Sequence, residues 1–215
     1  MASFDEIDRV LSYLDRCVRP SADIIADLES YSALLQKWQR IQNLVSRETL
    51  NLIWSRHFID SLQVLSLLKR SDRSFLDLGS GGGFPALPLA IALKGSDARF
   101  VLVEPNGRKV SFLRTVAREL GLAVQVDGRR SDQIDSRETP PINVITSRAL
   151  APLPQLNAMI APFFGPSTRA ILHKGREHVE ELAEAGAQWH FNVLLTKSDT
   201  AEDSVLIELS DLRSI

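Results

Sequence analysis

Four glycines occupy positions 79, 81, 82 and 83, directly after a short apolar run that carries one acidic residue, Asp77. The run Phe75–Leu78 predicts a buried strand, and the apolar segment after the glycines predicts a helix at 84–93. In a strand–turn–helix unit, glycines permit positive φ and let a ligand approach the backbone closely. The turn is therefore a candidate binding site, although glycine-rich turns also occur where no ligand binds.

The spacing of the glycines separates the possible ligands. A dinucleotide fingerprint, G-x-G-x-x-G, would need a third glycine where this chain has Phe84. A P-loop would continue with Gly-Lys-Ser/Thr, which does not follow here. The observed pattern is Asp77 followed by G-x-G-x-G from Gly79, a form typical of Rossmann-like enzymes that bind S-adenosylmethionine (SAM).

An acidic residue, Glu104, ends the next apolar run, Arg99–Glu104. A carboxylate at this strand end is placed to accept hydrogen bonds from both ribose hydroxyls of a nucleoside. Taken alone, Glu104 could equally be a solvated charge at the end of a strand. After the glycine turn, it favours a nucleoside cofactor, and we predict that Glu104 binds it.

Further polar residues follow the remaining predicted strands, where ligands of open α/β sheets bind. Asp132 or the backbone beside it could hydrogen-bond an adenine amino group. Arg148 and Lys174 are cations that could hold the cofactor carboxylate, a phosphate or a target base. The residues at these three strand ends are Arg129, Arg130, Ser131 and Asp132, then Ser147 and Arg148, then His173, Lys174 and Gly175.

Residues that other methylation chemistries require are missing from these strand ends. Methylation at carbon 5 of a pyrimidine needs a cysteine nucleophile, and the one cysteine, Cys17, lies in the first predicted helix. Methylation of an exocyclic amino group usually accompanies an Asn/Asp-Pro-Pro-aromatic turn, where this chain has Ser147–Leu150. An acceptor with a free lone pair, such as N7 of guanine, needs no base. Positioning and a suitable electrostatic environment would suffice.

Strands and helices are predicted to alternate from residue 75 onward, which implies a mainly parallel sheet. The predicted strands are 75–78, 100–104, 123–126, 142–146, 169–173, 188–196 and 204–209, and the predicted helices are 84–93, 107–120, 153–163 and 176–185. We expect an α/β, Rossmann-like fold of the class I SAM-dependent methyltransferases. It has a mostly parallel seven-stranded sheet, helices on both faces and an antiparallel final strand pair.

Residues 1–70 are predicted to form a helical extension packed on a core of residues 71–215, within one globular domain overall. Its apolar stripe runs over Ile24, Leu28, Tyr31, Leu34, Leu35, Trp38 and Ile41. A later helix, 49–68, carries Arg56 and Asp60 four residues apart, so the two could pair on one face. Polar residues of this helix could reach the cofactor pocket, or could form an ordinary surface ion pair.

Composition is compatible with a single soluble, cytoplasmic domain that contacts a structured RNA. The 215 residues are 44% hydrophobic, and the net charge is −2 at a sequence pI near 6.1. One cysteine and four histidines at unsuitable spacings argue against disulfides and a metal site. We see no signal peptide and no membrane-spanning run. A restricted basic face could bind RNA, or could be an ordinary solvated helix face; its cations are Arg99, Arg108, Lys109, Arg114, Arg118, Arg129, Arg130 and Arg137.

The chain resembles the bacterial ribosomal RNA small subunit methyltransferase G family, also called the glucose-inhibited division protein B family. The similar segments lie in the family's order between about residues 40 and 175. They are Asn43-Leu44, Arg56–Leu62, Phe75–Pro85, Gly107–Arg114, Thr146–Ala149 and His173–Gly175. Two positions depart from the usual family pattern, Gly82 in place of Pro and Phe84 in place of Leu.

The resemblance implies methyl transfer from SAM to N7 of one guanine in the decoding-region (530) loop of 16S rRNA, within the 30S subunit or an assembly intermediate. It implies cofactor contacts at Gly79, Gly81, Phe84, Ser131, Asp132 and Arg148, and RNA contact or catalysis by Arg56, His57, Arg130 and Lys174. It implies no metal, membrane or DNA partner. The alternatives are a methyltransferase for a small molecule or protein, and a SAM- or RNA-binding module without activity.

Overall fold

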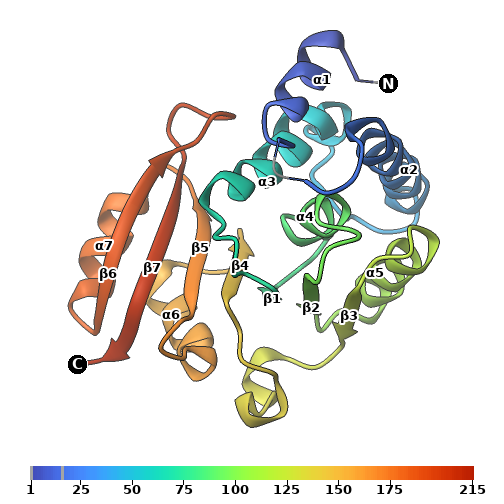
Figure 1. The fold of residues 1–215 in the computed structure, drawn as a ribbon. Coiled ribbons are helices and arrows are strands. Elements are labelled where there is room, and N and C mark those ends of the chain that lie inside the picture. The colour runs from blue at the N-terminus through green and yellow to red at the C-terminus, as the bar shows by residue number, and fades with distance from the viewer. Residues whose placement is uncertain (1, 16) are drawn as a thin grey trace.

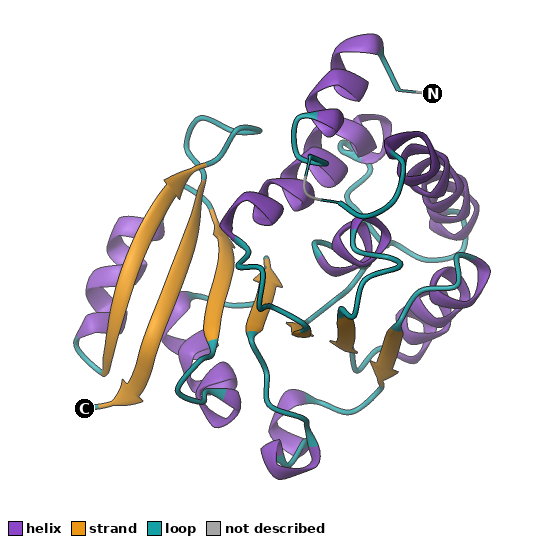
Figure 2. Ribbon diagram, viewed as in Figure 1, coloured by secondary structure: helices purple, strands orange, loops and turns teal. Residues whose placement is uncertain are grey.

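The computed structural model describes residues 2–15 and 17–215, so Met1 and Arg16 of the predicted extension lie outside the described residues. A seven-stranded sheet has the order β3-β2-β1-β4-β5-β7-β6, in which β7 alone breaks the parallel order by running antiparallel to both neighbours. Figure 2 shows the long β6–β7 pair at one edge of the sheet. The strands are β1 Ser74–Leu78, β2 Arg99–Val103, β3 Val124–Asp127, β4 Val144–Arg148, β5 Arg169–Lys174, β6 Trp189–Lys197 and β7 Val205–Ser214. The predicted fold class is confirmed.

The strand order reverses at β1, because the chain adds β2 and β3 on one side of it and β4 and β5 on the other. A crevice outside the carboxyl ends of β1 and β4 is the expected ligand site of such a sheet. The glycine turn follows β1, and Glu104 follows β2, whose residues pair with β1 in register (Leu78 with Val103). Adjacent parallel strands therefore bring these two predicted features to the same edge.

Helices cover both faces of the sheet, as Figure 1 shows, with α6 and α7 on one face and α2, α4 and α5 on the other. Alternation along β1 supplies both cores: Phe75 joins the cluster under α2, α4 and α5, and Leu76 joins the cluster under α6 and α7. The core helices are α4 Ala86–Ala92, α5 Gly107–Glu119, α6 Leu153–Ile160 and α7 His178–Gly186.

The N-terminal helices share the core of the sheet. Helix α1, Phe4–Leu11, is capped by Ser3, and α2 spans Ser21–Gln39. Most of the predicted apolar stripe is buried or partly buried in the cluster that also contains Phe75. Ile41 was wrongly included, because the chain turns after Gln39 and leaves Ile41 71% exposed. The division at residue 70 remains a proposal, and the shared core is a physical reason to treat the whole chain as one folding unit.

The predicted single helix at 49–68 is wrong in form. It is a succession of 3₁₀ turns at Leu50–Leu52, a π-helix at Ile53–Ile59, an α-helical turn (α3) at Asp60–Leu62 and a 3₁₀ turn at Gln63–Leu67. The wider π turn leaves Arg56 exposed while His57 and Phe58 are buried. Local π geometry is often found at functional sites.

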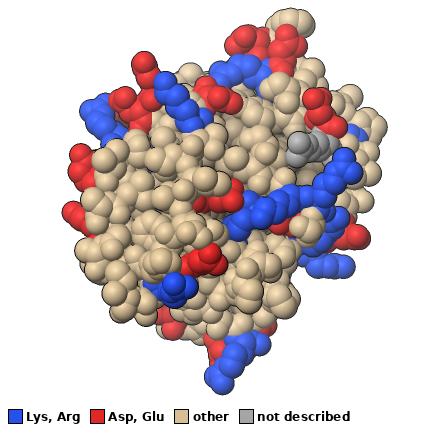
Figure 3. Space-filling model, turned by 60° about the vertical axis from the view of Figure 1, so that its left-hand side comes forward, with Lys and Arg blue, Asp and Glu red and all other residues tan. Residues whose placement is uncertain are grey.

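Most of the face in Figure 3 is uncharged, and its acidic and basic side chains stand in small groups. No helix among the described residues is long and apolar enough to cross a bilayer.

Candidate active site

The glycine turn is held by the carboxylate that follows β2. Glu104 is buried, and its Oε2 accepts a hydrogen bond from Gly81 N at 2.9 Å while its Oε1 accepts from Asn106 N at 2.9 Å. Each carboxylate oxygen has capacity for a second donor. Glu104 can therefore order the turn and still accept the hydroxyls of a ribose.

The turn presents its backbone to open space at Gly81. Gly79 and Gly81 have φ values of +69° and +54°, which L side chains rarely adopt. A Cβ on Gly81 would have only the Gly79 carbonyl, 3.7 Å away, within 4 Å. At Gly79, by contrast, the Leu150 side chain lies 2.6 Å from the Cβ position. The Cβ position of Gly81 is thus open, beside the Glu104 carboxylate that binds the Gly81 N–H.

Beneath the turn, Asp77 has one oxygen without a partner. Its Oδ1 accepts from the Thr146 hydroxyl at 2.7 Å, while Oδ2 is buried and makes no hydrogen bond. Burial raises the pKa of this carboxyl to about 7, and the hydrogen bonds of Ser80 and Thr146 only partly oppose the shift. An orphaned buried acceptor next to an open turn is the kind of group that a bound ligand satisfies. Sequence reasoning used Asp77 only as part of the motif and assigned it no role.

The predicted cofactor residue Phe84 forms a wall. Its buried ring stacks on His57, with centroids 4.7 Å apart, and packs against Tyr31 at 5.5 Å. The guanidinium carbon of Arg148 lies 5.1 Å from the same ring centroid. The Tyr31 hydroxyl, which no sequence motif singled out, donates to the Gly82 carbonyl. The N-terminal extension thus packs directly on the turn.

Arg148, at the end of β4, joins residues from the π-helix into one cluster. Its Nη1 donates to Asp60 Oδ2 at 2.9 Å and its Nη2 donates to His57 Nδ1 at 2.5 Å. His57 Nε2 must then carry the proton, and it donates to the Thr49 hydroxyl at 3.0 Å. The predicted Arg56–Asp60 pair is wrong, because Asp60 pairs with Arg148 and the exposed Arg56 reaches only the Thr200 carbonyl, at 3.4 Å.

His57 is held in its neutral form. Burial, and next the positive charge of Arg148, lower its pKa to about 3. Its unprotonated nitrogen is already occupied by the Arg148 guanidinium. His57 is therefore unsuited to remove a proton near neutral pH, and its Nδ1 holds one end of the Arg148 guanidinium.

A pocket of about 510 Å³ opens at the carboxyl ends of β4 and β5. The structure brings four predicted site residues to its lining, together with four residues of the β6–β7 hairpin, Ser198, Ala201, Ser204 and Val205. Lys174 is buried there: its amino group lies 2.6 Å from Glu181 Oε2 and donates to the Ala151 carbonyl at 2.7 Å. Glu181, in α7, has no motif that could have identified it. The four predicted residues are Arg56, His57, Arg148 and Lys174.

Three predicted residues after β3, namely Arg130, Ser131 and Asp132, do not line that pocket. Arg130 pairs with Asp132 at 3.3 Å, and the two side chains are 67% and 65% exposed. Ser131 begins a 3₁₀ turn, Ser131–Gln133, after β3. The adjacent Asp127 carboxylate is bound by Arg129, which lowers its pKa. Their assignments stay predictions. In the described parts of the chain, no three His, Cys, Asp or Glu side chains gather as a metal site would require.

Comparison with known proteins identifies the family. The family model for rRNA small subunit methyltransferase G (GidB) matches residues 24–204. The chain belongs to this family. A ribosomal RNA small subunit methyltransferase G from Bartonella tribocorum is 40% identical over 94% of each chain, and one from Cereibacter sphaeroides is 39% identical over 97% of this chain and 98% of that one.

Solved structures agree on the fold of this methyltransferase G family member. A TehB-like SAM-dependent methyltransferase from Corynebacterium glutamicum aligns with a TM-score of 0.56 at 12% identity, covering 85% of this chain and 98% of that one. That likeness concerns the fold alone. Family membership confirms the resemblance, and with it the SAM-dependent methyltransferase class and SAM as the cofactor.

Proposed function

We propose that this methyltransferase modifies N7 of one guanine in the decoding-region loop of 16S rRNA, within the small ribosomal subunit or an assembly intermediate. One observation carries the choice of acceptor: among the described residues, every side chain lining the pocket that could act as a general base is either paired or buried. His173 Nε2 donates to the Asp60 carbonyl at 2.9 Å, and its Nδ1 has no partner but is fully buried. His57 is neutral with its lone pair occupied, Asp60 is paired with Arg148, and Lys174 is paired with Glu181. N7 of guanine carries a lone pair and no proton, so its methylation requires none.

SAM, when bound, supplies an electrophilic methyl group on its sulfonium. We infer that Gly79, Gly81 and Glu104 hold its nucleoside part, on the evidence of the open space over Gly81 and the remaining acceptor capacity of Glu104. The other residues then have to position the base and exclude water. Arg56, which makes one long hydrogen bond and is exposed, is available to contact a phosphate or the guanine O6.

The buried groups of the pocket are proposed to order its walls. Arg148, His57 and Asp60 tie the end of β4 to the π-helix. Lys174 holds the Ala151 carbonyl and Glu181, which also accepts from Leu153 N at 2.7 Å. These bonds fix the loop from Arg148 to Pro152, which borders both the turn and the pocket. Because ribosomal subunits assemble in the cytoplasm, we also propose that the chain acts there.

Mapping N7-methylguanine in 16S rRNA from cells with and without the gene tests this function. We expect one decoding-region guanine to lose its modification in the deletion strain and to regain it with the wild-type gene, but not with a Gly81→Asp variant. An unchanged mark in the deletion strain would overturn the proposal. So would a restored methyl group at any position other than a guanine N7.

A further inference from the structure

Many cations of the predicted basic face are neutralised by neighbouring acids. Arg118 pairs with Glu119 at 3.0 Å, Arg130 with Asp132, and Arg137 with Asp135 at 2.6 Å. Arg129 bridges Asp127 and Glu138. Exposed pairs of this kind leave little net positive charge to attract a polyanion. The segment 118–137 is therefore a poor candidate for the main RNA contact.

A second group of basic side chains is not neutralised. It consists of Arg40, Arg47, Arg108 and Lys109. Across residues 2–15 and 17–215, none of these four side chains forms an ion pair or a side-chain hydrogen bond with another residue. The three arginines are exposed and Lys109 is half-buried. Their charges are free to meet an external anion.

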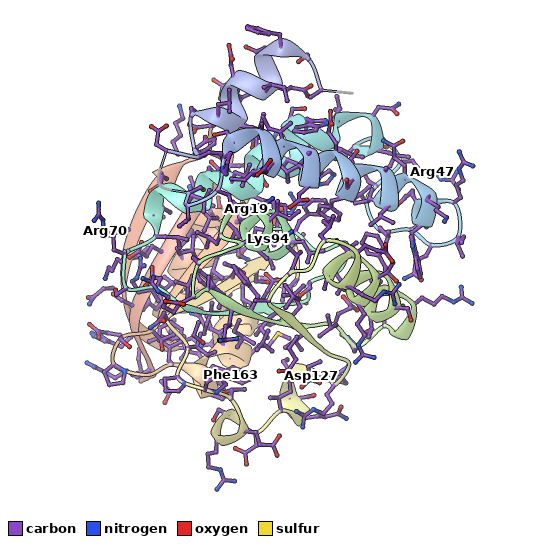
Figure 4. All side chains as sticks on the ribbon, turned by 45° about the vertical axis from the view of Figure 1, so that its right-hand side comes forward. Arg19, Arg47, Arg70, Lys94, Asp127 and Phe163 are labelled. Atoms are coloured by element: carbon purple, nitrogen blue, oxygen red, sulfur yellow. The ribbon has the colours of Figure 1, made fainter. Side chains whose placement is uncertain are left out.

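These four residues lie on one surface, which we call the 40–109 surface and which joins the end of α2 to the start of α5. Gln42 Nε2 donates to Asn106 Oδ1 at 3.2 Å, and this bond links the two elements. Figures 1 and 4 both show the connection after α2 beside α5, and Figure 4 shows Arg47 projecting outward from it.

Two hollows meet on the 40–109 surface. One of about 840 Å³ is lined by Arg108, Lys109 and Asn106, and one of about 800 Å³ by Arg40 and Arg47. Both include the segment 41–43. Amide side chains that can bond sugars and base edges also line them: Asn43 and Asn51 make no side-chain hydrogen bond within the described residues. Gln39 also lines one hollow, but its amide is bonded to the backbone of Leu44 and Val45.

The 40–109 surface adjoins the cofactor turn. A Cβ at Gly82 would lie 2.9 Å from the Leu44 carbonyl oxygen, so the chain after α2 touches the turn. Asn106 N binds the same Glu104 carboxylate as Gly81 N does. A strand lying on this surface would therefore lead directly to the edge of the sheet where methyl transfer takes place.

We propose that the 40–109 surface binds the phosphodiester backbone of the RNA that flanks the target guanine. Unpaired arginine and lysine side chains bind phosphate oxygens, and amides placed among them suit the splayed sugars and bases of an RNA loop. With a net charge of −2, the chain needs such a local concentration of cations to attract RNA. The inference rests on the proposed rRNA substrate.

A triple variant, Arg47→Ala/Arg108→Ala/Lys109→Ala, tests the proposal. Its matched control is Arg70→Ala/Arg118→Ala/Arg137→Ala, which removes the same charge from exposed sites elsewhere; Figure 4 shows Arg70 on the side opposite Arg47. The substrate is small ribosomal subunits from the deletion strain. Methylation kinetics, the salt dependence of subunit binding, and SAM affinity by calorimetry are measured for all three proteins.

We expect the triple variant to raise KM for subunits at least 10-fold, with kcat within about twofold of wild type and SAM affinity unchanged. Three lost phosphate contacts should also reduce the slope of log K against log salt by about 2. The control should stay near wild type. The docking surface would be overturned if the triple variant has the same KM as the control, or if the control shows as large a rise in KM. Wild-type activity on the subunits would in that case still support the proposed function. A wild-type protein that leaves the subunits unmodified would overturn both.

Discussion

Arg148 donates a hydrogen bond from Nη2 to Nδ1 of His57, 2.5 Å away and 91 positions apart in sequence. The bond sets the tautomer of His57 and connects the end of β4 to the π-helix of the N-terminal extension. Burial first, and then the charge of Arg148, lower the pKa of His57 and keep it neutral. Phe84, from the glycine turn, lies against both side chains. The glycine turn, the N-terminal extension and the end of β4 thus meet at the Arg148–His57 pair.

His57→Gln should weaken the acid sensitivity of folding. The folded-state pKa of His57 is lowered to about 3 from 6.5, so the unfolded chain binds the extra proton between these values and stability falls as pH drops through that window. In the wild-type protein this proton uptake lowers the free energy of unfolding by about 2 kcal/mol between pH 6.5 and pH 4.5, and the variant should lack this loss. Denaturant unfolding at both pH values measures it, with His190→Gln, at an exposed position, as control. Equal pH dependence in wild type and His57→Gln would contradict the assignment.

Asp77→Asn should have the opposite pH signature. The pKa of Asp77 is raised to about 7 from 3.8, so the folded state holds a proton that the unfolded chain has released, and stability falls as pH rises from 3.8 to 7. Relative to wild type, the free energy of unfolding of the variant should rise by about 2 kcal/mol between pH 5 and pH 8. Comparison at two pH values cancels any constant cost of the amide. The assignment of this pH dependence to Asp77 fails if the difference in free energy of unfolding between variant and wild type is the same at both pH values.

Gly81→Asp should abolish SAM binding, because the new side chain and its charge would occupy the open space over the turn. The control variant is Gly121→Asp, which introduces a similar backbone strain. Gly121 has φ +58° against +54° for Gly81, and a Cβ added there would also point into free space. Calorimetry should show at least a 100-fold loss for Gly81→Asp and no loss for the Gly121 variant. Equal affinities would remove the turn from the cofactor site.

Lys174→Ala should reduce methyl transfer far more than SAM affinity. Because the Lys174 amino group contacts Glu181 and the Ala151 carbonyl, we expect Lys174 to act through them. Glu181→Ala should then also lower kcat, about 10-fold, and the double variant should be little worse than either single one, because coupled residues are not additive. Kinetics and calorimetry on the wild type, the two single variants and the double variant measure whether the losses are additive. Additive losses, or a fully active Glu181→Ala, would instead indicate direct contact of Lys174 with RNA.

The local sequence pattern was sufficient to predict the secondary-structure elements and to bring together the residues of the proposed cofactor site. Hydrophobic periodicity located the seven strands to within a few residues, and a parallel order places the carboxyl ends of β1 to β5 at one edge of the sheet. Gly79, Gly81 and Glu104 could therefore be brought together without coordinates, since each directly follows a strand and β1 and β2 are neighbours. The resemblance to the family was carried by contiguous motifs, which sequence preserves directly.

Only the tertiary structure decided how the charged residues are used. The chain alone predicted Arg56 as the partner of Asp60 because four-residue spacing is visible in sequence, whereas packing delivered Arg148 from β4. The pairing of Lys174 with Glu181 and the π geometry around His57 were hidden for the same reason. Arg129, Arg130 and Arg137 instead pair with acids only two residues away, a spacing that does not show by itself whether a pair forms. Periodicity reports which face of an element is buried, but the partner of a buried charge depends on which elements the fold brings together.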